Sequence, residues 1–476
     1  MRFEQYYLGC LSQASYLVGD ETSGRAVVVD PRRDVGEYLD DAAAAGLRVE
    51  YVIETHLHAD FLSGHLELAA AAGATVIYGA GADVRFPHRA VADGERLDLG
   101  QVVLEFRATP GHTPESISIV VFETADAAAP YGVLTGDTLF IGDVGRPDLL
   151  ASQGQRPEDM ARQLYRSLHS RLLTLPDGTR VYPGHGAGSA CGKSLSAATV
   201  STIGEQRQTN YALRLATVEE FVRAVTEGQP PRPDYFAHVA ELNREPHGLL
   251  PDEDLPGLSV DEALRHQAGG AVVLDVRSPE EFARGHLRGS VNVGLDGRFA
   301  EHAGEVVEAG EGVVVVCEPG RGHEARVRLS RVGIDTVIGV LDRPAEALSE
   351  RPAVAEAASR LTARQLAEAR AEIPGLVLLD VRGPGERAEG HVEGSAHIPI
   401  ARLRQRIGEL DPARPVVAYC AGGYRSSTAA SLLRAHGFAD VSDLIGGYEA
   451  WAALSESEGG MGRRAGPQGR AGDTAS

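Results

Sequence analysis

The sequence predicts an α/β protein of three domains, in which a layered N-terminal domain is followed by two copies of a smaller α/β domain. Three observations predict this. The chain has 476 residues, whereas an ordinary domain has about 150. Apolar strand-like runs alternate with Ala-rich stretches in its first half. One segment of its second half occurs twice, at an offset of 105 residues.

The first half has the alternation expected of a layered domain. Four runs rich in β-branched residues are typical of strands, and they span residues 26–30, 51–55, 74–79 and 102–106. The Ala-rich stretches between them favour helices. A polar, Pro-rich stretch begins near residue 228 and indicates the end of this domain, to which we assign residues 1–250.

The second half contains the repeat. The segment from Val272, VVLDVRSPEEFARGHLRGSVNV, matches the one from Val377, VLLDVRGPGERAEGHVEGSAHI. Each copy is typical of a strand followed by a turn and a short helix, which is the start of an α/β unit. The offset is too long for a solenoid repeat. We therefore predict domains at 251–352 and 353–456, and a disordered tail at 457–476, which lacks apolar periodicity.

The composition excludes several kinds of partner. The chain has 46 Lys and Arg against 67 Asp and Glu, and its net charge of -21 repels nucleic acid and anionic lipid. No signal peptide and no apolar run of membrane-spanning length is found. We expect a soluble cytoplasmic enzyme with small-molecule partners; a homo-oligomer is left open. No C-x-x-C pair occurs, so we expect free thiols at Cys10, Cys191, Cys317 and Cys420.

Possible metal ligands follow the predicted strands of the first domain. The run YVIET leads directly into three of them within five residues, and the other three each follow a glycine. They are His56, His58, Asp60, His112, Asp137 and His185. One buried histidine is more often structural than a ligand, but a whole series at strand ends is what a metal site needs, because a rigid sheet fixes the directions of its ligands.

This series resembles the metallo-β-lactamase superfamily, whose pattern is H-x-H-x-D-H followed by separated His, Asp and His. The resemblance covers residues 1 to about 245 and implies an αβ/βα sandwich with the metal at one edge of its two sheets. One position departs from the pattern. Phe61 stands where the hydrolases of the superfamily have a histidine for their second zinc. A phenylalanine cannot bind a metal, so a mononuclear site is favoured.

Within the superfamily the chain is most similar to the persulfide dioxygenase branch. That resemblance implies one Fe(II) per chain, held by His56, His112 and Asp137. Two histidines and one carboxylate on one face form the arrangement by which non-haem Fe(II) binds both substrate and O₂. The remaining residues of the series would orient these ligands, hold water or be remnants of a second metal site: His58, Asp60 and His185.

Two further segments support this branch, GDVGRPDL after Asp137 and STIGEQRQTNYAL at 201–213. The resemblance implies that Arg146 helps to hold an anionic thiol carrier, commonly glutathione. The alternative for Arg146 is a surface salt bridge. A family tyrosine that often follows the last histidine of the series is absent, because residues 186–188 are Gly, Ala and Gly, which leaves the carrier open.

Cys191 is a further candidate catalytic residue. It lies six residues beyond His185 and is flanked by small residues. A thiol near a metal could carry or accept the sulfur of a persulfide. The alternative is an inert small side chain beneath the loop.

The C-terminal repeat carries a second nucleophile. The strand-like run VVAY ends at Cys420, and AGGYRSS and a helical run follow. Backbone N–H groups of a glycine-rich loop and the start of a helix favour a thiolate. The pattern C-x-x-G-x-R-S, with LDVR and GH-x-x-GS upstream, resembles rhodaneses over residues 355–455 and implies sulfur transfer through Cys420 with Arg425 in its loop. A cysteine phosphatase would have five residues between Cys and Arg, but here there are four.

The middle repeat has an altered loop, Cys317-Glu318-Pro319-Gly320-Arg321. Its acid opposes a thiolate and its proline removes one N–H donor. We therefore expect this domain to be catalytically silent and to position the active one.

The predicted function is the oxidation of a thiol persulfide to sulfite with O₂, coupled to rhodanese transfer that makes or uses thiosulfate. Two alternatives remain. One is a zinc-dependent thioester hydrolase of the glyoxalase II type with rhodanese domains. The other is a sulfur-carrier or redox-sensing protein whose metal domain is only structural.

Overall fold

The computed structural model describes residues 1–149, 151 and 154–461, and the chain forms two compact units. The first contains Met1–Val272 and Leu295–Arg343, and the second contains Val273–Gly294 and the chain from Pro344 onward. The boundary therefore passes through the middle repeat. Each unit is described by itself.

The first unit begins with a six-stranded sheet in the order β1-β2-β3-β4-β5-β6. Strands β1 to β3 are antiparallel, and β3 to β6 are parallel. The strands are β1 (Arg2–Leu8), β2 (Gln13–Asp20), β3 (Arg25–Val29), β4 (Arg48–Ile53), β5 (Thr75–Gly79) and β6 (Arg89–Val91). Every residue of β2 is buried, as expected of a strand covered on both faces.

A second six-stranded sheet has the order β12-β11-β10-β9-β8-β7. Only β10 and β11 pair in parallel; the other neighbours are antiparallel. The strands are β7 (Arg96–Asp98), β8 (Val103–Ala108), β9 (Ile117–Phe122), β10 (Gly132–Gly136), β11 (Arg180–Pro183) and β12 (Ser201–Thr202).

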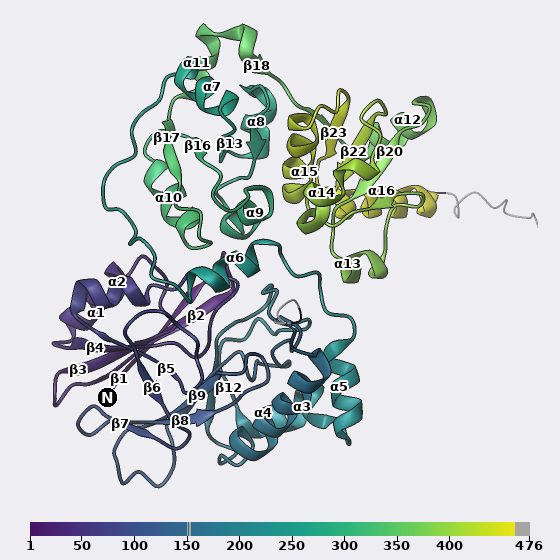
Figure 1. Ribbon diagram of the computed structural model, residues 1–476. Coiled ribbons are helices and arrows are strands. Elements are labelled where there is room, and N and C mark those ends of the chain that lie inside the picture. The colour runs from purple at the N-terminus through teal and green to yellow at the C-terminus, as the bar shows by residue number, and fades with distance from the viewer. Residues whose placement is uncertain (150, 152–153, 462–476) are drawn as a thin grey trace, which may run out of the picture. The chain divides into compact units, whose positions relative to one another are not determined.

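The two sheets pack face to face and carry helices on their outer faces (Figure 1). Ile53 and Phe106 meet in the core between the sheets. Tyr38 of α1 and Leu68 of α2 pack on the first sheet, while α3 and α5 cover the second. The helices are α1 (Gly36–Ala44), α2 (His65–Ala72), α3 (Pro157–Ser167), which continues as a π-helix (Leu168–Leu172), α4 (Ile203–Thr209) and α5 (Val218–Thr226). The expected αβ/βα sandwich is confirmed.

This arrangement brings the ends of several strands to one edge of the sandwich. Strands β4, β8, β10 and β11 end at Ile53, Ala108, Gly136 and Pro183, and each is followed within four residues by His56, His112, Asp137 and His185, respectively. Four of the candidate ligands are thus presented from strand ends that belong to two different sheets.

The rest of the first unit comes from the stretch after the sandwich and from part of the middle repeat. Its elements are α6 (Tyr235–Leu242), α7 (Val260–Ala268), α9 (Phe299–Val306), β16 (Val313–Val316), α10 (Gly322–Ser330) and β17 (Val337–Leu341). Strands β16 and β17 pair in parallel. The buried guanidinium of Arg33 joins these parts, since it pairs with both Glu67 and Asp335.

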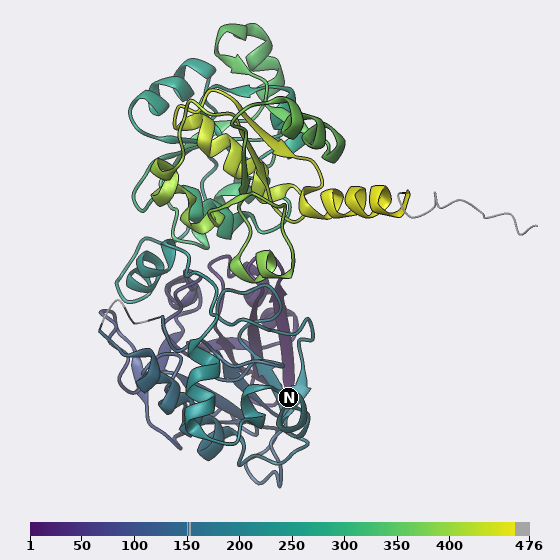
Figure 2. The same ribbon diagram turned by 90° about the vertical axis from the view of Figure 1, so that its right-hand side faces the viewer.

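The second unit contains a five-stranded parallel sheet in the order β19-β23-β22-β20-β21. The strands are β19 (Ser359–Leu361), β20 (Val377–Asp380), β21 (Ala396–His397), β22 (Val416–Tyr419) and β23 (Val441–Leu444). The helices are α12 (Ala363–Glu372), α13 (Pro384–Glu389), α14 (Ile400–Arg406), α15 (Tyr424–Ala435) and α16 (Gly447–Met461). Figure 2 shows α16 side-on at the end of this repeat.

Part of the middle repeat completes the second unit, which takes all of β13 except its first residue, Val272. Its elements are β13 (Val272–Asp275), α8 (Pro279–Arg284), β14 (His286–Leu287), β15 (Val291–Asn292), α11 (Pro344–Glu350) and β18 (Ala355–Glu356). Strands β13 and β15 pair in parallel, and β14 pairs with β18. As the repeat predicts, β13 and β20 both end at an aspartate that Val and Arg follow.

The predicted strands agree with β3, β4, β5 and β8 to within three residues at each end. Helix α16 runs to Met461. Residues 457–461, which were expected to be part of a disordered tail, are therefore helical and continue the Ala- and Glu-containing start of α16. Residues 462–476 of that tail lie outside the described residues. The domain limits 251–352 and 353–456 stay a prediction.

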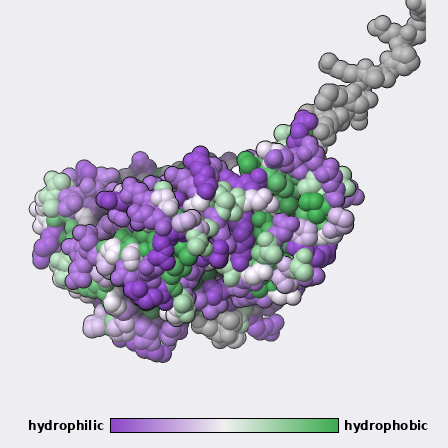
Figure 3. All heavy atoms as spheres, turned by 90° about the horizontal axis from the view of Figure 1, so that it is seen from above, coloured by the Kyte–Doolittle hydropathy of each residue, from purple (hydrophilic) through white to green (hydrophobic). Residues whose placement is uncertain are grey.

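The face shown in Figure 3 is mostly hydrophilic, with apolar side chains in small separate areas. Over residues 1–149, 151 and 154–461, no helix combines the length and the apolar character needed to cross a bilayer.

Candidate metal centre and thiol site

Three predicted ligands meet at the edge of the sandwich. One ligand atom each of His56, His112 and Asp137 lies within 4.8 Å of the others, and all three side chains are buried. Asp137 Oδ2 is 3.9 Å from His56 Nε2 and 3.4 Å from His112 Nε2. Within the described part of the chain, none of these three atoms has a hydrogen-bond partner. Buried polar atoms are rarely left unpaired, so three facing one another fit a bound cation.

The opposite side of each imidazole is held by the protein. His56 Nδ1 is 2.9 Å from Thr55 Oγ1, which in turn donates to Asp30 Oδ2 at 2.8 Å. His112 Nδ1 is 2.9 Å from the carbonyl oxygen of Arg146. Such contacts fix the ring orientation and leave Nε2 for a metal.

Two glycines allow the main chain to approach the carboxylate. A Cβ at Gly145 would lie 1.9 Å from the carbonyl oxygen of Asp137, and a Cβ at Gly184 would lie 2.6 Å from Asp137 Oδ1. Any larger residue at either position would displace Asp137. This explains the glycine in the GR-x-D segment and the one before His185.

The charges suit metal binding. Burial and the neighbouring His58 lower the pKa of His56 well below its usual value, and burial also lowers the pKa of His112. Burial opposes ionisation of Asp137, but His185 and the other imidazoles lower its pKa nevertheless. Neutral imidazoles and an ionised carboxylate are the forms that bind metals.

His58 belongs to a different buried cluster. Its Nε2 lies 3.1 Å from both Asp30 Oδ1 and Glu54 Oε2, and its ring packs on Phe61 with 4.3 Å between centroids. Burial opposes a charged ring, yet the two acids raise the pKa of His58 to about 10. The ring of His58 lies beside that of His56, with 4.1 Å between centroids, but His58 is grouped with Asp30 and Glu54 and is not among the three facing ligand atoms.

A third cluster adjoins the triad. His185 bridges two carboxylates, with Nδ1 at 2.8 Å from Asp137 Oδ1 and Nε2 at 2.7 Å from Asp60 Oδ2. Cys191 is buried, and one ligand atom each of Cys191, Asp60 and His185 lies within 4.8 Å of the others. Burial, Asp60 and Asp137 raise the pKa of the Cys191 thiol.

The side chain of Arg146 is buried and largely engaged. Nε and Nη2 form a bidentate pair with Asp148 at 2.7 and 2.8 Å. Nη1 donates to the carbonyl of Ala190, and Nη2 also donates to that of Pro230. Arg146 thus ties the GR-x-D segment to the chain just before Cys191, a contact that sequence reasoning did not anticipate.

A pocket is lined in part by Leu57 and Thr113, the residues that directly follow His56 and His112. Residues of the two loops that follow His56 and His112 contribute to it, and so does α6, which comes after the sandwich in the chain. Its lining includes Leu57, Ala59, Thr113, Glu115, Arg232, Phe236, Ala240 and Arg244. It combines an apolar wall with both cationic and anionic groups, which suits a small polar ligand.

Sequence reasoning also missed Asn243. This fully buried residue follows α6, and its amide nitrogen donates to the carbonyls of His58 and Phe61 at 2.9 and 2.8 Å. Its Oδ1 accepts from the N–H of Ser63 at 2.9 Å. Asn243 therefore fixes the main chain of the loop that carries His56. No local pattern marks it, because its partners are about 180 residues away.

In the second unit, Cys420 follows β22 and faces the start of α15. The N–H of Gly423 donates to Cys420 Sγ at 3.1 Å, and Ser426 Oγ lies 3.7 Å from the sulfur. Gly423 has a φ of 98°, which favours glycine at this turn. Arg425 pairs with Glu386 of α13 through two contacts of 2.8 and 2.6 Å. The loop thus places one of the expected backbone donors, the N–H of Gly423, at the sulfur.

Cys317 follows β16 in the first unit and is fully buried. Its loop continues through Gly320, and Arg321 pairs with Glu324 and Asp296.

Comparisons with known proteins agree with this geometry. A model of the metallo-beta-lactamase superfamily matches residues 8–185, and a model of the rhodanese-like domain matches residues 259–347 and 362–454. The mitochondrial persulfide dioxygenase ETHE1 of Bos taurus is 35% identical over 237 residues, which are 48% of this chain and 82% of that protein. A hydroxyacylglutathione hydrolase of Methylococcus capsulatus is 38% identical over 172 residues, 36% of this chain and 60% of that protein.

Among solved structures, a metallo-beta-lactamase from Staphylococcus aureus is similar, with a TM-score of 0.65 and 33% identity. The match covers 72% of this chain and 99% of that one, which is more than an N-terminal sandwich alone.

Proposed function

Because the chain belongs to the metallo-β-lactamase superfamily, among the relatives of persulfide dioxygenase, and carries two rhodanese-like domains, we propose that it oxidises thiol persulfides and transfers sulfane sulfur. The overall oxidation is RSSH + O₂ + H₂O → RSH + SO₃²⁻ + 2 H⁺, with R a carrier such as glutathione. The sulfane sulfur is oxidised, O₂ is reduced and the carrier thiol is released.

One observation carries the oxidation half. The buried, unpaired atoms of His56, His112 and Asp137 face one another, with Phe61 in the place of a second-metal ligand. Two histidines and a carboxylate are the ligand set of non-haem iron oxygenases, so we assign one Fe(II) to them. When bound, this ion supplies the activation of O₂.

The chain's own residues would prepare the substrate. The apolar wall formed by Leu57 and Phe236 excludes water from the persulfide, and Arg232 or Arg244 offers positive charge to a carrier carboxylate. Arg146 is proposed to help bind the carrier through the N–H that remains on Nη1. His185 lies between Asp60 and Asp137, and these two carboxylates raise its pKa, so its imidazolium would hold Asp137 in place and not take up a proton.

Cys191 is proposed to lie on the sulfur path. Its thiol is clustered with Asp60 and His185, beside the proposed ligand Asp137. A thiol there can accept sulfane sulfur from a persulfide RSSH by disulfide-type exchange, in which the S–S bond breaks, a Cys191 persulfide forms and RSH leaves.

The transfer half rests on Cys420. Its thiolate attacks the outer sulfur of thiosulfate, the S–S bond breaks, sulfite leaves and a Cys420 persulfide remains. The N–H of Gly423 and the start of α15 stabilise negative charge on that sulfur. Run in reverse with sulfite as acceptor, the same step makes thiosulfate. Cys317 is proposed to be silent.

A zinc thioester hydrolase is the second candidate. The group formed by Asp60, His185 and Cys191 favours it, because these atoms could hold a second ion beside the triad. A sulfur-carrier role without turnover is the third.

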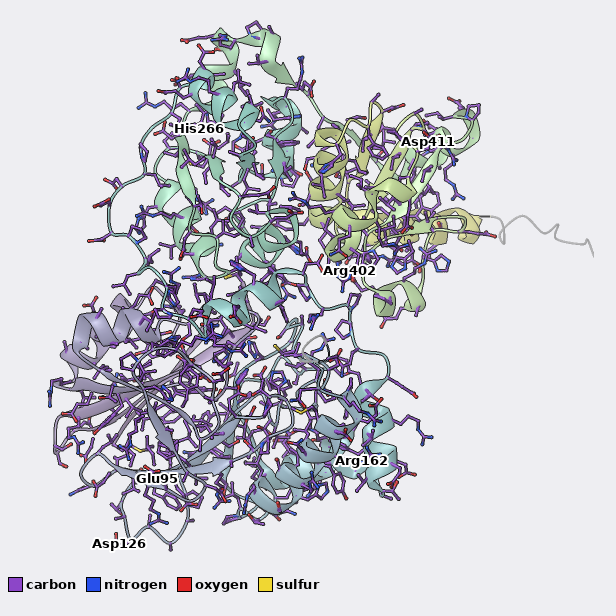
Figure 4. All side chains as sticks on the ribbon, in the orientation of Figure 1. Glu95, Asp126, Arg162, His266, Arg402 and Asp411 are labelled. Carbon is purple, nitrogen blue, oxygen red and sulfur yellow. The ribbon has the colours of Figure 1, made fainter. Side chains whose placement is uncertain are left out.

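Metal analysis of variants tests the proposal. We expect one iron per chain in the protein purified and loaded without air, and loss of both iron and oxygen uptake on glutathione persulfide in His56→Ala, His112→Ala and Asp137→Ala. His266→Ala is the control; Figure 4 labels this histidine on α7, outside the three clusters. Two zinc ions per chain with thioester hydrolysis and no oxygen uptake would overturn the proposal.

A further inference from the structure

The helix that follows Cys420 is held by a segment of the middle repeat that belongs to the same unit. Ser427 Oγ donates to Asn292 Oδ1 at 2.7 Å, and the N–H of Asn292 donates to Ser431 Oγ at 2.8 Å. The hydroxyl of Tyr424 donates to the carbonyl oxygen of Gly294. Residues 424, 427 and 431 are three and four apart, so they lie on one face of α15.

Asn292 is itself fixed. It is buried, and its amide nitrogen donates to the carbonyls of Asp275 and Arg277 at 3.0 and 2.9 Å. Asp275 and Arg277 form a buried bidentate pair. Both repeats contain this Asp-Val-Arg sequence. In the silent repeat its main-chain carbonyls hold Asn292, the residue that contacts α15.

The C-terminal repeat differs at the corresponding place. His397 occupies the position of Asn292, and its Nε2 lies 2.8 Å from the carbonyl of Arg382, the counterpart of Arg277. The inner contact is therefore common to both repeats, but Asn292 also has an oxygen directed at Ser427. Among the contacts of the described residues, Asn292 of the middle repeat receives a helix at this position, whereas His397 contacts its own repeat.

These contacts begin directly at the thiol loop. Tyr424 is the first residue of α15 and follows Gly423, whose N–H donates to Cys420 Sγ. Movement of Tyr424 would move that donor away from the sulfur. The next residue, Arg425, is held by Glu386 of its own repeat.

We propose that Tyr424, Ser427 and Asn292 are positioning residues, through which the silent middle repeat holds the Cys420 loop in the form that transfers sulfur. This inference rests on the proposed sulfur transfer at Cys420. It gives the middle repeat a defined task that needs no thiol of its own.

The test uses the full chain with Tyr424→Phe, Ser427→Ala and Asn292→Ala. Tyr424→Phe and Ser427→Ala each remove one hydrogen bond between α15 and the middle repeat, and Asn292→Ala removes the one from Ser427 together with two to carbonyls of its own repeat. For the first two variants, kcat for sulfur transfer from thiosulfate to cyanide should fall about 3- to 10-fold with little change in KM, and for Asn292→Ala by at least as much. The pH profile of Cys420 alkylation by iodoacetamide, followed by mass spectrometry of its peptide, should move to higher pH because the Gly423 N–H is less often at the sulfur.

The control is Ser455→Ala, which removes a hydroxyl bonded only to the carbonyl of Trp451 on α16 among the described contacts. It should change neither kcat nor the alkylation profile. Tyr424→Trp, which keeps a ring but cannot place a hydroxyl at Gly294, should behave like Tyr424→Phe.

An unchanged kcat and an unchanged alkylation profile in Tyr424→Phe and Ser427→Ala would overturn the inference, even if the melting temperature fell. If the unmodified protein transfers no sulfur from thiosulfate, the proposed transfer fails. The shift in the alkylation profile then still decides whether Tyr424, Ser427 and Asn292 position Cys420.

Discussion

The carbonyl oxygen of Arg146 lies 2.9 Å from Nδ1 of His112, so the GR-x-D segment reaches the metal centre through its main chain. The guanidinium of the same residue is bound by Asp148 and by two carbonyls. The side chain therefore holds in place the carbonyl that orients a proposed ligand.

Arg146→Ala should lower iron affinity about 10- to 100-fold, the usual cost of losing a group that orients a metal ligand. Iron content is measured after dialysis against a graded chelator, and KM for glutathione persulfide is measured on protein kept saturated with iron. Arg162→Ala is the control, since Figure 4 labels Arg162 on the exposed side of α3. A raised KM with unchanged iron affinity would instead assign Arg146 to the carrier alone.

His58→Ala should keep most of its iron and lose only part of its oxygen uptake. The imidazole pairs with Asp30 and Glu54 and is not among the three facing ligand atoms. Its loss leaves two buried carboxylates facing each other, which should also lower the melting temperature. Metal analysis and thermal unfolding check this. Complete loss of iron in a folded variant would show that His58 binds the metal.

The three proposed metal ligands could be predicted from the sequence because each follows a strand within four residues, and the fold brings the strand ends together. The same is true of Cys420, whose loop is continuous in sequence. Asn243 and Asn292 could not be predicted, since each acts on a partner more than 130 residues away. The division of the middle repeat between two units could not be predicted from the sequence either. The repeat pattern indicates local structure, and it does not indicate which elements pack against one another.

Cys420→Ser should abolish sulfur transfer from thiosulfate and leave oxygen uptake intact, because the proposed metal ligands and Cys420 belong to different units. Cys317→Ser is the matched control and should change neither activity. Persulfide mapping by mass spectrometry should find sulfane sulfur on Cys420 and not on Cys317. Full transfer activity in Cys420→Ser would refute the assignment of the nucleophile.

Cys191→Ser should lower oxygen uptake without loss of iron, since its thiol lies in the cluster with Asp60 and His185 and not in the triad. Cys10→Ser, at a half-buried thiol outside these clusters, is the control. Iron content and initial rates on glutathione persulfide are compared. Loss of iron would make Cys191 a ligand, and an unchanged rate would make it a packing residue; either result contradicts the proposed sulfur path.

The stoichiometry of oxygen and sulfite tests the central claim most directly. Protein loaded with Fe(II) is given glutathione persulfide in a closed oxygen-electrode cell, and sulfite is trapped and counted. Cys420→Ser is used so that sulfur transfer does not consume the sulfite. The proposed reaction predicts one O₂ consumed for each sulfite formed, with one iron per chain. Sulfite without oxygen uptake, or no sulfite with thioester hydrolysis by a zinc-loaded protein, would contradict it.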